Sequence, residues 1–100
     1  MALQSFGFIV AGNGFNPATH RSTMQSEQFT MLAVGVSQPA EAPAVAREMV
    51  EAGVQLIELC GAFGAADTAR VQQAVPESVP VGAVSYGGAA IGALHRLVAA

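Results

Sequence analysis

The residue types best suited to chemistry lie in one short stretch, Val54-Gln-Leu-Ile-Glu-Leu-Cys-Gly-Ala-Phe-Gly64. Its first half has the apolar composition of a buried strand, and its second half is a turn framed by glycines. Glu58 lies in the middle of the strand, where burial of a carboxylate costs several kcal/mol unless a partner or a proton neutralises it. We therefore expect Glu58 to be a general acid or base beside a small ligand, or a structural residue paired across a subunit contact.

The end of this strand carries a second candidate group. Side chains alternate along a strand, so Cys60 is predicted to share a face with Glu58. Cys60 is a candidate nucleophile, although a lone cysteine is more often a small buried apolar residue. Gly61, Phe63 and Gly64 lead into a helix, where backbone amides can bind an anion; glycines at such a turn are also required by backbone geometry alone.

Other candidates follow the first and last predicted strands. His20 and Arg21 lie in a long connection, where an imidazole would serve as an acid or base and a guanidinium would hold a carboxylate. A solvated turn is the alternative for this pair. The remaining candidates are Tyr86 as a catalytic acid and, as ligand contacts, Asn13, Gly87 and Gly88.

Neither a metal nor a cofactor is expected. A metal site would have to use His20, Glu58 and Cys60, which have no recognised ligand spacing. His95 lies beside Arg96 near the end of the chain and is predicted to be a surface or interface residue.

The absence of lysine excludes whole classes of chemistry. All four basic side chains other than histidine are arginines, so no side chain can form a Schiff base with a carbonyl substrate or with pyridoxal phosphate. A phosphate-binding loop ending in Gly-Lys is excluded for the same reason. The net charge of −3 argues against a nucleic acid partner, which calls for a basic patch.

The composition predicts self-association. Hydrophobic residues make up 52% of the 100 residues and charged residues only 11%, so the chain has too little polar surface to cover itself. We expect a homo-oligomer, most simply a dimer. Neither a membrane span nor a signal peptide is expected, and the single cysteine is compatible with the cytoplasm.

The pattern along the chain alternates strands with helices. Strands are predicted at 5–11, 28–36, 54–60 and 81–86, and a short helical turn at 16–21. An amphipathic helix begins between 39 and 44 and ends before Gly53, because apolar residues recur there at helical spacing: Ala42, Val45, Ala46, Met49 and Val50. Further helices are predicted at 65–75 and 88–99, the last with Ile91, Leu94 and Val98 on one face.

This order, β-β-α-β-α-β-α, predicts a single compact α/β domain spanning 1–100, with a mostly parallel four-stranded sheet. Half of a β/α barrel and a flavodoxin-like sheet both fit, and a ferredoxin-like layer is the alternative. In the first two, ligands bind where the parallel strands end. That edge would bring together the glycine-rich turns that follow three of the strands, at 12–14, 60–64 and 85–88.

The chain also resembles a known family. Ile57-Glu-Leu-Cys-Gly-Ala-Phe-Gly64, with Glu51-Ala-Gly53 before it and Val79-Pro-Val-Gly82 after it, is similar to small bacterial proteins catalogued as a domain of unknown function. The pairs His20-Arg21 and Tyr86-Gly87 match the same family. The resemblance covers nearly the whole chain and implies no activity.

Two functions remain open. The first is a small cytoplasmic enzyme that acts by proton transfer, as an isomerase or lyase, on a small carbonyl or carboxylate metabolite, and the partner expected for it is a small anionic metabolite. Glu58 would be its base and Tyr86 or His20 its acid. The second is an oligomeric ligand-binding or scaffold module without catalysis, in which Glu58 is an interface residue.

Overall fold

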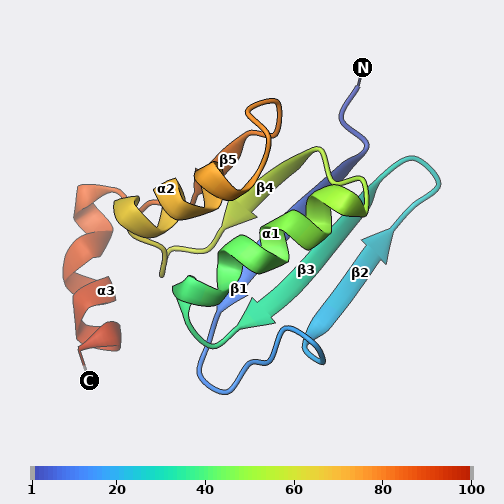
Figure 1. Cartoon of the computed structure of the whole chain (residues 1–100). Helices are drawn as coiled ribbons and strands as arrows, with labels where there is room; N and C mark the ends of the chain where they lie inside the picture. Colours follow the sequence, from blue (N-terminus) through green and yellow to red (C-terminus); the bar gives the residue numbers. More distant parts are fainter. Residues whose placement is uncertain (1, 100) are drawn as a thin grey trace.

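Five strands form one mixed sheet in the computed structural model, which describes residues 2–99 (Figure 1). The strands are β1 (Ser5–Ala11), β2 (Arg21–Gln25), β3 (Thr30–Val36), β4 (Leu56–Leu59) and β5 (Val81–Ala83). Their order across the sheet is β2-β3-β1-β4-β5. β1 is parallel to β3 and β4, and β4 is parallel to β5, whereas β2 is antiparallel to β3. The α/β class is confirmed; the prediction of four strands is wrong by one strand.

The strand missing from the prediction is β2. A helical turn was expected at 16–21, but the structure has a turn only at 17–19, and Arg21 already belongs to β2. All five side chains of β2 are exposed, so Arg-Ser-Thr-Met-Gln lacks the apolar alternation that marks a half-buried strand. Three of the four strand pairings are parallel, which also rules out the ferredoxin-like alternative, whose sheet is antiparallel.

Three α-helices and two short 3₁₀ turns complete the fold of the described residues. The 3₁₀ turn η1 (Pro39–Glu41) leads into α1 (Ala42–Glu51), α2 (Ala65–Ala74) follows β4, and η2 (Gly88–Ala90) precedes α3 (Ile91–Val98). As predicted, α1 begins at a proline-containing turn and ends before Gly53, whose φ of 98° few other residues adopt. No helix among the described residues is long and apolar enough to cross a membrane.

The core lies between the sheet and the two helices α1 and α2 (Figure 1). Of the predicted stripe, α1 buries Ala42, Val45, Ala46 and Met49, and Val50 is partly buried against the same core. The buried residues contributed by the strands and by α2 are Ile9, Val34, Val36, Ile57, Leu59 and Val71. Alternate residues of β1, β3 and β4 therefore point into this layer, as the two-residue period of a strand requires.

The opposite face of the sheet is covered by neither α1 nor α2. We call it the uncovered face; its side chains come from β1 (Phe6, Phe8, Val10), β2 (Ser22, Met24), β3 (Met31, Ala33) and β4 (Leu56, Glu58), with Gly82 of β5. Right-handed crossovers that run in opposite directions across a sheet place their helices on opposite faces. α1 lies in the connection from β3 to β4 and α2 in the connection from β4 to β5, and both connections run toward the β5 edge of the sheet. Only the connection from β1 to β3 runs the other way, and it contains β2 in place of a helix.

The helix α3 stands apart from the sheet (Figure 1). None of its residues is buried, and the exposed fractions of Ile91, Leu97 and Val98 are 50%, 78% and 74%. The sequence predicts an apolar face on this helix, and within the described chain that face has no surface to pack against.

Candidate functional site

The carboxyl ends of the parallel strands bring several predicted residues to one edge. Cys60 follows β4 directly, and its Sγ lies 3.3 Å from the amide nitrogen of Ala11, the last residue of β1. The amide of Val84, just after β5, donates to the carbonyl of Leu59 over 2.9 Å. The turn containing Asn13 follows β1 at the same edge. The predicted convergence of these connections is therefore present.

Tyr86 and Gly61 meet at this edge. A side-chain carbon added at Gly61 would lie 2.9 Å from Cε1 of Tyr86, so the absence of a side chain at Gly61 lets the ring rest on the backbone. Tyr86 was predicted to end the fourth strand, but β5 stops at Ala83 and the ring belongs to the following loop. It remains half-exposed.

Glu58 is exposed, which contradicts the expectation of a buried carboxylate. It lies on the uncovered face, between Phe8 of β1 and Gly82 of β5 in the register of the sheet. The reason is topological, because the face to which it points receives neither α1 nor α2. A hollow of about 210 Å³ adjoins Glu58 and is lined by Gly82, Ala83 and Val84 as well. Among the described residues Glu58 makes no side-chain hydrogen bond or ion pair.

Cys60 does not accompany Glu58. β4 ends at Leu59, so the alternation that would place the two side chains on one face does not reach Cys60. The thiol instead packs against the core and accepts the hydrogen bond from Ala11. This favours the small buried apolar role over the nucleophile, because the sulfur already satisfies a backbone donor at the end of β1.

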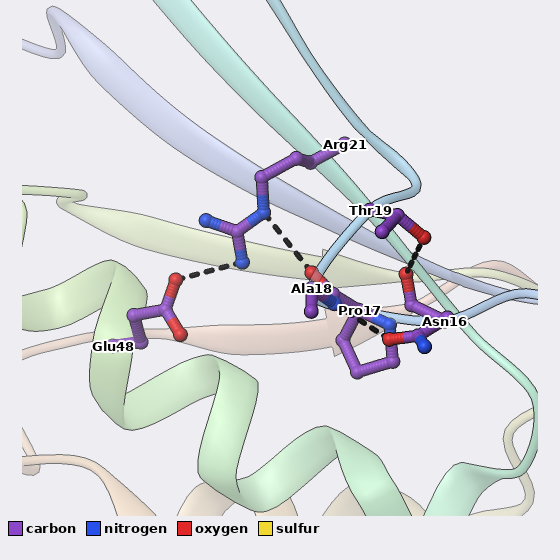
Figure 2. Close-up of polar contacts among 6 residues, drawn as sticks. All are labelled: Asn16, Pro17, Ala18, Thr19, Arg21 and Glu48. Atoms are coloured by element: carbon purple, nitrogen blue, oxygen red, sulfur yellow. Dashed lines mark hydrogen bonds and ion pairs between the residues drawn. The ribbon is translucent and has the colours of Figure 1, made fainter.

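Arg21 is held by other residues rather than aimed at the edge where the candidates gather. Figure 2 shows its guanidinium between the carboxylate of Glu48, at 2.7 Å from Nη2, and the carbonyl of Pro17, to which Nε donates over 3.0 Å. The ion pair ties the start of β2 to α1. Arg21 was predicted to hold the carboxylate of a ligand, but its positive charge is already paired with Glu48 within the chain.

His20 is positioned by the same turn. The backbone amide of Asn16 donates to Nδ1 of His20 over 2.8 Å, so Nδ1 is an acceptor and the proton of the neutral ring lies on Nε2. The side chain of Asn16 also accepts from the amide of Ala18 at 2.9 Å and shapes the turn (Figure 2). The Phe15 ring lies beside His20, with 5.3 Å between centroids.

His20 borders a second hollow on the uncovered face, far from Glu58. This hollow of about 210 Å³ is lined by His20, Val10, Ser22 and Ala33, among others. His20 immediately precedes β2, whereas Glu58 is on β4, so three strand spacings, about 14 Å, separate them across the sheet. One small substrate does not bridge that distance, and the structure therefore does not bring this predicted acid–base pair together.

The remaining predicted ligand contacts divide into exposed and structural residues. Asn13, Gly87 and Gly88 are exposed in the connections after β1 and β5. Phe63 is buried in the core, and the amide of Gly64 donates to the Asp67 carboxylate at 3.0 Å. Phe63 and Gly64 thus stabilise the start of α2.

A carboxylate that accepts three hydrogen bonds just before α1 was not predicted from the sequence. Oε1 of Glu41 accepts from the amide and the hydroxyl of Ser37, both at 2.7 Å, and from the amide of Gln38 at 3.2 Å. The hydroxyl of Ser37 and then these two amides hold the pKa of Glu41 below its ordinary value of 4.5. The signal was present in Gln38-Pro-Ala-Glu41, whose spacing is that of a capping box.

An apolar hollow of about 330 Å³ was also missed. It lies on the uncovered face near the start of β1, and its lining includes Phe6, Met24, Phe29 and Met31. The rings of Phe6 and Phe29 are 5.7 Å apart. A larger, open hollow of about 520 Å³ lies at the other end of the sheet from the glycine-rich turns, around residues 25–30, and contains none of the predicted site residues. Within residues 2–99, no three His, Cys, Asp or Glu side chains gather as metal ligands would.

Comparison with known proteins assigns the chain to a family. A family model described as a family of unknown function, DUF6506, matches residues 4–99. The chain therefore belongs to this family, in agreement with the resemblance seen in its sequence. Searches of the curated proteins and of the solved structures found no match.

Proposed function

We propose that this member of DUF6506 binds a small carbonyl or carboxylate metabolite on the uncovered face and transfers a proton at Glu58. The observation that carries the proposal is the position of Glu58: it is the one ionisable side chain in the set that defines the uncovered face, and its neighbours in register, Phe8 and Gly82, leave its carboxylate free. A metabolite in the hollow beside Gly82 and Val84 would contact it directly.

The chemistry follows from displacement of water. An exposed carboxylate is hydrated, and a ligand lying on an apolar wall removes that water, which strengthens the interaction of the carboxylate with an acidic C–H or O–H group. Tyr86, at the same sheet edge, is the better placed of the two predicted acids, since its loop follows β5, the neighbour of β4. Its hydroxyl would supply or accept the second proton.

The strand order supports a ligand site in this region. Without β2, the parallel strands run β3-β1-β4-β5, which corresponds to the 2-1-3-4 order of flavodoxin-like sheets. In such sheets ligands bind where the order reverses, here at the carboxyl ends of β1 and β4. The helices α1 and α2 cover one face of the sheet only, as the helices of half a β/α barrel would. The free thiol of Cys60 suits a reducing compartment, and we place the protein in the cytoplasm.

A non-catalytic binding or scaffold module is the second candidate function. It is favoured by the structural engagement of three other predicted site residues, Arg21, Cys60 and Gly64. In this function Glu58 holds a ligand or a partner without moving a proton.

The two functions differ in the fate of the bound ligand's protons. Short 2-oxo acids and aldehydes, with pyruvate first, would be incubated with the protein in D₂O and followed by ¹H NMR. If the protein transfers protons, deuterium should be incorporated on the carbon next to the carbonyl of the compound. The Glu58→Gln protein should no longer catalyse this incorporation. The control is Glu77→Gln, in the exposed turn between α2 and β5, which should retain it.

Mapping of the bound ligand completes the test. Amide shift changes at Phe8, Glu58 and Gly82 without deuterium incorporation would establish the binding module instead of the enzyme. If the tested compounds shift no residue of the uncovered face, both functions are wrong for this class of metabolite.

A further inference from the structure

Two apolar surfaces of this chain have no partner within it. One is the uncovered face, where Met24 is 70% exposed, and the other is α3. Within residues 2–99, six of the eight exposed large hydrophobic residues lie on or beside these two surfaces: Phe15, Met24, Val84, Ile91, Leu97 and Val98. Surface apolar area gathered in this way marks an interaction site rather than the scattered exposure normal for a soluble domain.

We propose that α3 of one copy docks on the uncovered face of a second copy, and that the second copy's α3 docks in return. The result is a homodimer in which each sheet gains the helix that its own topology omits. This inference does not rest on the proposed catalytic function, although the partner's helix would form a wall of the same site.

The chemistry of the two surfaces is complementary. At helical spacing Ile91, Leu94 and Val98 form one stripe on α3, and Leu97, three residues after Leu94, widens it on one side. The apolar hollow lined by Phe6, Met24, Phe29 and Met31 offers a place for such side chains. A helix stripe packed on one face of a sheet is the ordinary two-layer arrangement of α/β domains.

The charges agree with this pairing. Residues 78–100 contain no acidic side chain, and their ionisable groups with basic character are His95 and Arg96. The set that defines the uncovered face contains one ionisable group, the carboxylate of Glu58. His95 follows Leu94 directly and flanks the apolar stripe, whereas Arg96 lies on the opposite side of the helix. Docking therefore brings a basic flank toward a face whose strand residues carry one carboxylate and no cation. His20 borders the same face but lies beside Val10, at the other end of β1 from the apolar hollow at Phe6.

The available area fits a reciprocal dimer better than a single contact. A stable interface buries about 800 Å² on each partner. α3 has eight residues and is about 12 Å long, so one docked helix presents only part of that area. Reciprocal docking uses both the helix and the sheet face of each copy and doubles the buried surface.

Point variants of the full chain test the proposal by sedimentation and light scattering at micromolar concentration. The wild type is expected to be a dimer. Leu97→Asp on α3 and Met24→Asp on the sheet each place a charge in the interface and should raise the dimer dissociation constant at least about tenfold. Gln73→Asp, on the exposed side of α2, adds the same charge elsewhere and should leave the dimer intact.

Mixing the variants identifies the contact. An equimolar mixture of Leu97→Asp with Met24→Arg gives a heterodimer in which one contact is wild type and the other joins opposite charges, so it should associate more tightly than either variant does with itself. Because Leu97 and Met24 are exposed, far-UV circular dichroism should show both variants folded.

Several outcomes would overturn the proposal. A wild type that stays monomeric means that α3 does not join two copies. A Leu97→Asp protein that remains dimeric means that the sheets, and not the helices, form the interface. Equal loss of dimer in Gln73→Asp would show a general charge effect. These outcomes concern association, whereas the Glu58→Gln deuterium experiment reports proton transfer, so the failure of one proposal can be told from the failure of the other.

Discussion

The ring of Tyr86 lies directly against the backbone of Gly61, where an added side-chain carbon would come within 2.9 Å of its Cε1. Gly61→Ala should therefore push the ring outward. Tyr86 is the only tyrosine and the chain has no tryptophan, so the intrinsic fluorescence reports on this ring alone. We expect greater quenching by iodide in the variant, with a loss of unfolding free energy below about 1 kcal/mol because the half-exposed ring can move.

The control for this experiment is Gly82→Ala. An added carbon at Gly82 meets no atom within 4 Å, so its quenching should match the wild type. Identical quenching in both alanine variants would show that Tyr86 does not rest on Gly61 in solution.

The ion pair between Arg21 and Glu48 should contribute little to stability. The side chains are 35% and 56% exposed, and solvent screens such pairs strongly. Glu48→Gln should lower the unfolding free energy by less than about 1 kcal/mol, and added salt should remove the difference. Urea denaturation at low and high salt measures both, with Glu51→Gln on the same helix as the control. If salt does not change the unfolding free energy lost in Glu48→Gln, the loss comes from packing and not from the ion pair.

The hydrogen bond from the amide of Asn16 requires an unprotonated Nδ1 on His20. Long-range ¹H–¹⁵N correlation spectra should show the tautomer with hydrogen on Nε2. His20→Asn keeps an acceptor near the position of Nδ1, whereas His20→Gln places its polar group farther out. The glutamine variant should be less stable by about 1 kcal/mol and the asparagine variant by less. The opposite ranking would contradict this role of His20.

Glu41 should make the fold sensitive to acid. Its pKa is lower in the folded chain than its ordinary value of 4.5 because of the hydroxyl of Ser37 and the amides of Ser37 and Gln38. The stabilisation is complete above the ordinary value and is lost as the pH falls below it, through the lowered folded value. Glu41→Gln should remove this part of the pH dependence, and Glu77→Gln should not. The unfolding free energies of the wild type and both variants, measured at about pH 7 and about pH 3, test this expectation.

Much of the architecture was predictable because its signals are local. The helical spacing of Ala42, Val45 and Met49 and the cap at Gly53 defined α1 almost to its ends. The apolar run at Ser5–Ala11 defined β1. The convergence of Cys60, Gly61 and Tyr86 followed from a general rule, because parallel strands end at the same edge of a sheet.

The errors arise where the outcome depends on the whole sheet. β2 has no buried side chain, so its strand conformation comes from pairing with β3 and leaves no periodic mark. Glu58 was expected to be buried because its neighbours Ile57 and Leu59 are. Alternation showed that Glu58 points the other way, but only the route of the β1–β3 connection shows that this face lacks a helix.

The place of β1 in the sheet also has a consequence for synthesis of the chain. β1 is the first of the five strands to be made but lies at the centre of the sheet, with β3 and β4 as its neighbours. Its second neighbour is complete only at Leu59, so the apolar run of β1 stays unpaired on one side until the chain as far as Leu59 has left the ribosome. Such delayed, long-range pairing slows folding and exposes the nascent strand to chaperones before the domain can close.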